Sequence, residues 1–212
     1  MQCPLCGTRK PRRFCPAKSA QICSICCATK REVEIDCPVS CGYLREGYNY
    51  AEVKNPLEQR ARTLSFERTF DRTFLIANEA LLMELWQVIW EAFQSIRSLH
   101  DSDVISALAA LEKTYRTLDS GLYYDSRPEN SLQQLLYSKL KEHLDIKMQN
   151  PDVQQHHLKV STVVDCLNFM QQFAQMKSSG RPLSRGFLLQ LEEIFARMPG
   201  KSTSAEPRIL LS

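Results

Sequence analysis

The 212-residue chain lacks any long apolar stretch that is free of charge. Its most apolar segment, residues 74–93, is interrupted by Glu79, Glu84 and Glu91, whereas a membrane-spanning helix needs about 20 predominantly apolar residues in succession. The N-terminus also lacks the basic start and apolar stretch of a secretory signal. We therefore expect a cytoplasmic protein that does not cross a membrane.

The motifs of common catalytic sites are missing as well. The sequence contains no phosphate-binding loop, nucleophile elbow or dinucleotide fingerprint. It also has no Glu-x-x-His motif, which a di-iron site in a helical bundle needs, and its first histidine is His100. We assign no catalytic residue, and an enzyme with an unrecognised site in the helical part is our third hypothesis.

Cysteine, by contrast, is concentrated near the N-terminus, where eight of the nine cysteines lie between positions 3 and 41. A gap of two residues lets both thiolates of a tight turn point at one ion, and a following glycine permits the left-handed backbone that aims N–H groups at sulfur. A disulfide framework belongs to secreted chains, so we interpret these cysteines as metal ligands. The candidate ligands are Cys3, Cys6, Cys15, Cys23, Cys26, Cys27, Cys37 and Cys41.

Eight thiolates suffice for two closed zinc sites, which would be structural because neither has an open coordination position. We favour an interleaved assignment over a sequential one, and the sequence leaves open which ion Cys26 and Cys27 each serve. The cysteine spacings match neither common ferredoxin pattern, which argues against an iron–sulfur cluster. The interleaved sites would be Cys3, Cys6, Cys23 and Cys26 for one ion, and Cys15, Cys27, Cys37 and Cys41 for the other.

Three motifs occur here in a recognisable order: Cys3-Pro-Leu-Cys6-Gly7, Phe14-Cys15-Pro16 and Ile22-Cys23-Ser24-Ile25-Cys26, followed by a closing cysteine pair. Together they resemble the small cross-brace zinc fingers of the HIT and MYND type, over about forty residues. Lys18 stands where those fingers have a cysteine, and the histidine that usually precedes their last cysteine is missing. Cys27 is our candidate for the missing ligand. The resemblance implies a zinc fold that binds proteins.

Positive charge is concentrated in the same segment. Residues 1–47 hold eight Lys and Arg against four Asp and Glu, although the whole chain has a net charge of only +3. The cluster of Arg9, Lys10, Arg12 and Arg13 is a candidate for sequence-independent contact with nucleic-acid phosphates. The alternative is that these cations balance the negative zinc–thiolate sites and keep the thiols deprotonated.

Apolar residues recur at helical spacing from about Asn55-Pro56 onward. Residues 74–96 are apolar nearly all round, which indicates the central helix of a bundle, and we expect a break before them because one helix over residues 56–100 would be roughly 65 Å long. We predict a mostly α fold, in which a small zinc-binding module with tiny β-hairpins precedes an antiparallel helical bundle. Further helices are expected to start at Ser102, at Ser131, at Asn150-Pro151, and at Pro182 or Ser184.

The predicted domains are a zinc module over residues 1–47, a helical bundle over 52–198 and a disordered tail over 199–212. Within the bundle, the segment 118–125 is the least helical, and we expect its tyrosines to pack against the helices rather than to form a functional loop. Cys166, between apolar neighbours, is expected in the core.

These features predict a non-catalytic zinc-binding protein that acts as an adaptor or scaffold for a protein partner. The second hypothesis is a nucleic-acid-binding or transcription-regulatory protein that uses the basic head. A homo-oligomer is compatible with either hypothesis, and the sequence identifies no partner.

Overall fold

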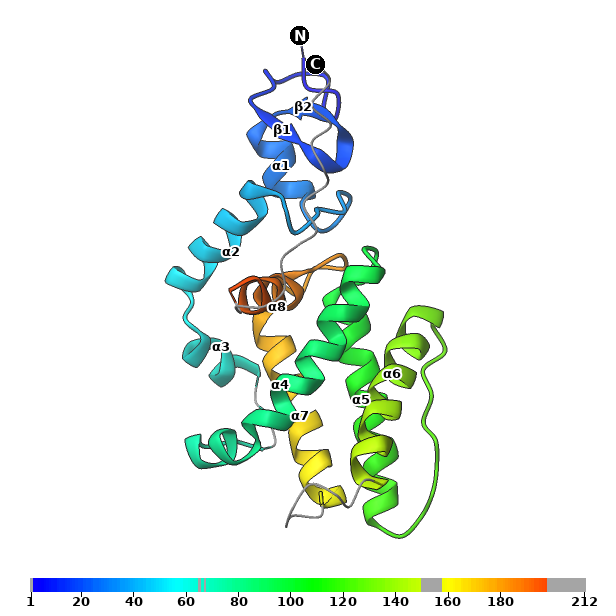
Figure 1. Ribbon diagram of the computed structural model, residues 1–212. Helices are drawn as coiled ribbons and strands as arrows, with labels where there is room; N and C mark the ends of the chain where they lie inside the picture. Colours follow the sequence, from blue (N-terminus) through cyan, green and yellow to red (C-terminus); the bar gives the residue numbers. More distant parts are fainter. Residues whose placement is uncertain (1, 65, 67, 150–157, 198–212) are drawn as a thin grey trace, which may run out of the picture.

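The computed structural model describes residues 2–64, 66, 68–149 and 158–197 (Figure 1). In this part of the chain it contains eight α-helices and one two-stranded antiparallel sheet. The prediction of a mostly helical fold is therefore confirmed. The predicted tail 199–212, the end of the bundle at residue 198 and the predicted helix start at residues 150–151 lie outside the described residues.

The cysteine-rich segment, residues 2–41, forms a small module that we call the head. It contains strand β1 (Arg13–Cys15), a 3-10 turn (Pro16–Lys18), strand β2 (Ala20–Ile22) and helix α1 (Ser24–Lys30). The strands pair antiparallel, with Phe14 opposite Gln21. In Figure 1 the head sits at one end of the helical bundle, beside α8.

Two helices lead from the head to the bundle, α2 (Gly42–Lys54) and α3 (Leu57–Leu64). Helix α2 crosses the segment between the two predicted domains. Asn55 ends α2, where its backbone N–H donates to the carbonyl of Ala51 over 2.8 Å. Helix α3 then begins directly after Pro56, close to the helix start that the sequence suggested at Asn55-Pro56. The long apolar pattern after Pro56 is interrupted between α3 and α4 (Arg72–Ser95). The sequence predicts such a break, because a single helix over this pattern would be too long for the domain.

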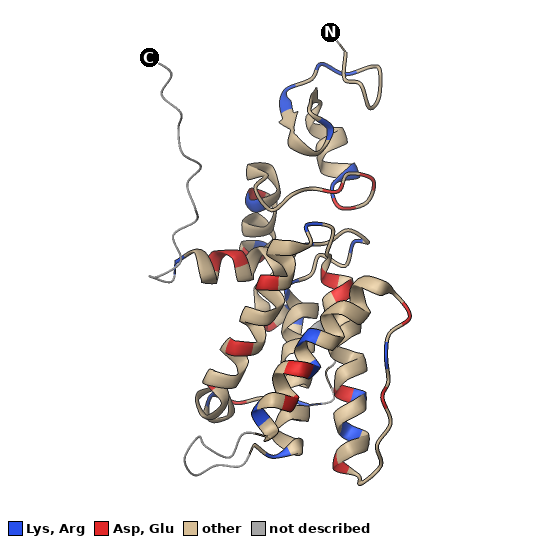
Figure 2. Ribbon diagram, turned by 45° about the vertical axis from the view of Figure 1, so that its right-hand side comes forward, with Lys and Arg blue, Asp and Glu red and all other residues tan. Residues whose placement is uncertain are grey.

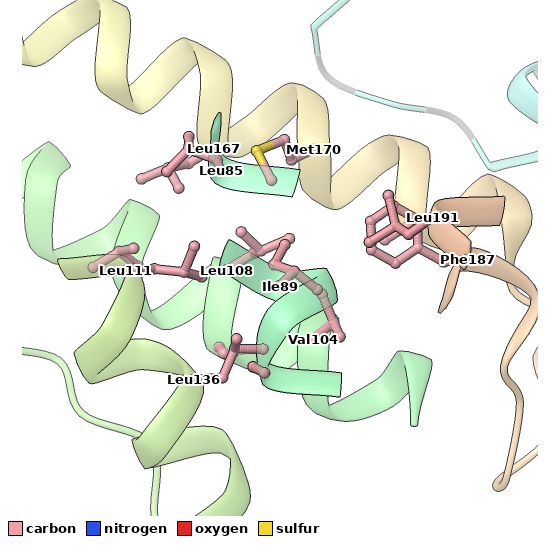
Figure 3. Packing of buried hydrophobic residues seen from close by; sticks show 14 of the residues in the cluster. Leu85, Ile89, Val104, Leu108, Leu111, Leu136, Leu167, Met170, Phe187 and Leu191 are labelled. Atoms are coloured by element: carbon pink, nitrogen blue, oxygen red, sulfur yellow. The ribbon is translucent and has the colours of Figure 1, made fainter. Parts of the chain in front are cut away.

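The bundle consists of α4, α5 (Asp101–Asp119), α6 (Ser131–Gln149), α7 (Val160–Lys177) and α8 (Gly186–Ala196). Helices α4 and α5 each contact α6, α7 and α8, so they share the centre that the sequence assigned to residues 74–96 alone. All five helices contribute fully buried side chains to one core (Figure 3), and burying such a chain contributes roughly 1.5–3 kcal/mol. Examples are Leu85, Ile89, Leu108, Leu136, Leu167, Met170 and Phe187. Cys166 is also fully buried there, as predicted.

Several helix starts are set by residues other than those the sequence suggested. The side chain of Asn130 accepts hydrogen bonds from the N–H groups of Leu132 (2.9 Å) and Gln133 (3.4 Å), so Asn130 rather than Ser131 caps α6. Helix α8 begins at Gly186, beyond Pro182 and Ser184. Its first N–H groups are capped from another helix, by Asp101 of α5.

The expectation that the two tyrosines of segment 118–125 pack against the bundle was wrong, because Tyr123 and Tyr124 are 69% and 63% exposed. Polar contacts further along hold this loop in place instead. Asp125 accepts a hydrogen bond from Tyr137, and the N–H of Ser126 donates to the hydroxyl of Thr114 over 3.0 Å. The anchored residues therefore lie just after the tyrosines, which point outward.

Among the described residues, no helix combines the length and apolar character that crossing a membrane requires.

Candidate metal centre

Four cysteines of the head come together in space. The Sγ atoms of Cys3, Cys6, Cys23 and Cys26 all lie within 4.8 Å of one another. Three of these residues are buried and Cys6 is half-buried. Four sulfurs at such distances can hold one metal ion, and a closed set of four thiolates is typical of a structural zinc site. This is the quartet that the interleaved assignment placed on one ion, and it includes Cys26 rather than Cys27.

Local backbone geometry explains why these sulfurs converge. The carbonyl of Cys3 accepts from the N–H of Gly7 over 2.8 Å, which closes a tight turn, and Gly7 adopts φ = 65°, a left-handed conformation that glycine takes without strain. The N–H of Cys23 donates to Cys3 Sγ over 3.2 Å, and that of Cys26 donates to Cys23 Sγ over 3.3 Å. Cys23 therefore caps α1 with its sulfur, and the first turn of the helix carries Cys26 inward.

Hydrogen bonding and burial shift the pKa values of Cys6 and Cys26 in opposite directions. Hydrogen bonds from the Thr8 hydroxyl and from the N–H groups of Thr8 and Arg9 lower the pKa of Cys6 to about 5. Burial, reinforced by the neighbouring cysteines, raises the pKa of Cys26. The surroundings therefore favour the thiolate at Cys6 and the thiol at Cys26. A bound metal ion would displace the remaining protons, because cysteine ligates as the thiolate.

The other four predicted ligands are less tightly gathered. Cys15, Cys37 and Cys41 are buried in the same cluster of the head. Burial raises the pKa of Cys37 to about 11, and the nearby Cys41 and Cys15 add to this effect. Cys27 is half-buried and lies beside two guanidinium groups, with its Sγ 3.7 Å from Arg13 Nη1 and 3.9 Å from Arg31 Nη2. Within the described residues, the Sγ atoms of this set do not all lie within 4.8 Å of one another, as those of the first quartet do.

The basic cluster is divided by the fold. Arg13 contacts the sulfur of Cys27 and also lies over the ring of Tyr43, at 4.7 Å from its centroid. Arg9, Lys10 and Arg12 are exposed. The helices of the bundle carry both positive and negative residues (Figure 2). One member of the candidate nucleic-acid surface thus faces a thiol, as expected if the positive charge of the head serves its cysteines.

The head joins the bundle through a buried polar junction that the sequence did not reveal. Glu32, just after α1, is 2% exposed and adopts φ = 55°. Its carboxylate accepts hydrogen bonds from the Tyr48 hydroxyl (2.5 Å), the Ser179 hydroxyl (3.0 Å) and the Arg185 N–H (3.0 Å). A carboxylate buried to this extent needs such partners, because an unpaired buried charge is strongly destabilising.

Arg185 is the cationic counterpart in this junction and is also only 2% exposed. Its guanidinium donates to both carboxylate oxygens of Asp36 and, over 2.9 Å, to the carbonyl of Cys37. It also donates to the carbonyls of Arg97 (2.8 Å) and Leu99 (3.1 Å), which follow α4. One side chain thus connects a candidate metal ligand of the head with the end of a bundle helix.

Close packing completes the junction. A Cβ atom at Gly186 would lie 2.2 Å from the carbonyl oxygen of Lys177 and 2.4 Å from the ring of Tyr48, so only glycine fits there. Val39, between Cys37 and Cys41, belongs to the apolar core of the bundle. Glu32 and Arg185 are 153 residues apart, and no local motif marks either one.

The chain matches no protein-family model, and no curated protein or solved structure shows significant similarity to it.

Proposed function

We propose that this protein is a non-catalytic zinc protein whose head is folded by two structural ions and presents a surface for a protein partner. The convergence of four cysteine sulfurs within 4.8 Å carries the metal part of this proposal. The buried cluster of the head supports it further, because six of its nine buried members are cysteines. A segment with so little aliphatic core depends on metal to fold.

The second ion would be bound by Cys15, Cys27, Cys37 and Cys41. The burial of three of these thiols, and the influence of Cys15 and Cys41 on the pKa of Cys37, support a shared site. Cys27 would have to turn from Arg13 and Arg31 toward the other three sulfurs. Both arginines would then remain close to the thiolates and offset their negative charge.

Zinc stoichiometry tests this part directly. Purified full-length protein, kept reduced, should contain close to two zinc ions per chain by elemental analysis. The Cys27→Ser variant should contain close to one. A content near zero in the wild type, with thiols that titrate as free, would contradict the metal function.

Exposed apolar side chains on the head support the interaction role. Phe14, Ile25 and Val33 are 54%, 48% and 45% exposed. Aromatic and aliphatic side chains held on a rigid module are typical anchors of protein interfaces. The resemblance to cross-brace zinc fingers favours the same role.

Affinity capture from native extract tests the interaction, with the wild type compared against a Phe14→Ser and Ile25→Ser double variant of unchanged zinc content. The proposal expects a protein that the wild type retains after nuclease treatment and that the variant loses. Capture that disappears with nuclease, and that depends on Arg9, Lys10 and Arg12, would instead support the nucleic-acid hypothesis.

A further inference from the structure

Helix α1 connects the cysteine quartet directly to the bundle. The helix carries Cys26 of the quartet, and its last carbonyls are bound by a residue of the α7–α8 loop. Arg181 Nη1 donates to the carbonyls of Arg31 (2.7 Å) and Ala28 (3.3 Å). The next residue, Glu32, enters the buried junction, where its own carbonyl accepts from the N–H of Leu183 over 2.9 Å. The position of α1 is therefore linked to that of residues 178–186.

The Cys37–Cys41 segment makes a second connection. The carbonyl of Cys37 and the carboxylate of Asp36 share the guanidinium of Arg185, and Val39 packs in the bundle core. If this segment withdrew, the guanidinium of Arg185 would lose three of its five hydrogen bonds. A buried guanidinium cannot lose these partners without rearrangement, because leaving one partner of a buried pair uncompensated is strongly destabilising.

The loop that receives both connections leads straight into α8. Ser184 donates to Asp101 over 2.7 Å, and the same carboxylate accepts from the N–H groups of Phe187 and Leu188 at the start of α8. Phe187 lies in the bundle core (Figure 3). A shift of residues 178–186 must therefore change how the first turn of α8 sits on α5.

We propose that metal loading of the head is coupled to the seating of residues 178–186 and α8 on the bundle, with Glu32 and Arg185 as positioning residues. This inference rests on the proposed metal function. The head without metal has too small a core to hold Glu32, Asp36 and Val39 in place, so their partners in the loop lose their fixed positions. Coupling of this kind is reciprocal, so weakening the junction must also weaken metal binding.

The chain contains its own reporter for this coupling. Both of its tryptophans, Trp86 and Trp90, lie in α4, and the head has none. Trp90 donates to Glu192 of α8 over 3.0 Å and stacks on Phe195 of the same helix, with ring centroids 5.2 Å apart. Tryptophan emission therefore reports the seating of α8, and direct assay of bound zinc reports the head.

The experiment uses the full chain, stripped of metal with a chelator under reducing conditions and then titrated with Zn²⁺. In the wild type, tryptophan emission should change with the same stoichiometry as zinc binding, and amide exchange in residues 186–196 should slow. In Glu32→Gln and Arg185→Lys, zinc should still bind, but about tenfold more weakly and with most of the tryptophan response lost. Far-UV circular dichroism checks that both variants are folded.

Arg116→Lys is the matched control, because Arg116 is an exposed residue of α5 that pairs with Glu112 outside the junction. It should retain both the zinc affinity and the tryptophan response. Stoichiometric zinc binding with unchanged emission and unchanged exchange in α8 would overturn the coupling and leave the metal function standing. A wild type that binds no zinc would overturn both.

Discussion

The head and the bundle achieve stability by different means, although they belong to one short chain. In the bundle, aliphatic and aromatic side chains from five helices fill a single core. In the head, cysteines occupy most of the buried positions, and Ile22, Ile35 and Leu44 are the other buried members of its cluster. A segment of this size cannot bury enough apolar surface to fold without a cross-link or a metal. Under the proposed function, the head depends on its metal ions and the bundle on its packing.

The strongest test of this contrast is removal of one quartet cysteine. Cys23→Ser should abolish metal binding at the quartet and unfold the head, because structural zinc contributes roughly 10–16 kcal/mol in zinc-finger peptides. Most of the helical circular dichroism should remain, since the long helices lie in the bundle. Cys166→Ala provides the control, since its thiol is buried in the bundle core. The Cys166→Ala variant should keep the full zinc content. A loss of zinc in both variants would contradict the assignment of metal binding to the head alone.

A core truncation in the bundle should show the opposite pattern. Leu108 is fully buried in α5, so Leu108→Ala should lower the free energy of unfolding by about 2–5 kcal/mol through lost apolar contact and a residual cavity. Denaturant unfolding followed by tryptophan fluorescence measures this loss. The zinc content per folded chain should not change. A variant with normal bundle stability but depleted zinc would contradict the contrast.

Asp101 of α5, which binds Ser184 and the start of α8, predicts that the stability of the bundle depends on pH. Burial, with a contribution from the charge of Glu32, raises the pKa of Asp101 to about 6. The folded state therefore binds this proton more tightly than the unfolded chain, in which the carboxyl titrates near 3.9. The stabilisation from this group is fully present below pH 4 and is lost as the pH rises through about 6, with a total of about 3 kcal/mol.

Comparison with Asp101→Asn isolates that effect from the titration of the cysteines. The difference in free energy of unfolding between wild type and variant should shift by about 3 kcal/mol between pH 4 and pH 8, in favour of the variant at high pH. Both proteins should be measured with the same metal content. Parallel stability profiles over this range would show that Asp101 keeps an ordinary pKa.

The smallest effect should come from a helix end away from the junction. Asn130→Ala removes the side chain that caps α6, which should cost about 1 kcal/mol. Asn130→Ser should restore most of the loss, because serine accepts the same kind of hydrogen bond. Thermal unfolding of the two variants measures the difference, and equal stability of Asn130→Ala and wild type would show that the cap contributes nothing.

Local patterns in the sequence determined much of this protein. The cysteine spacing favoured a quartet of Cys3, Cys6, Cys23 and Cys26, because turns and the first turn of a helix fix the directions of nearby side chains. It left open whether Cys26 or Cys27 joins this quartet, and the fold places Cys26 there. The apolar periodicity predicted the mostly helical class, because a helix must turn one face toward the core. Both signals act over a few residues, so they can be recognised without knowledge of the whole fold.

The tertiary structure alone decided how these parts are joined. Glu32 and Arg185 are charged residues in loops, where sequence reasoning expects solvent contact, and both are buried because they find partners about 150 residues away. Asp101 caps a helix that begins 85 residues later. Tyr123 and Tyr124 are exposed because the residues just after them hold the loop. Which distant groups meet depends on the packing of whole helices, and no short stretch of sequence encodes that choice.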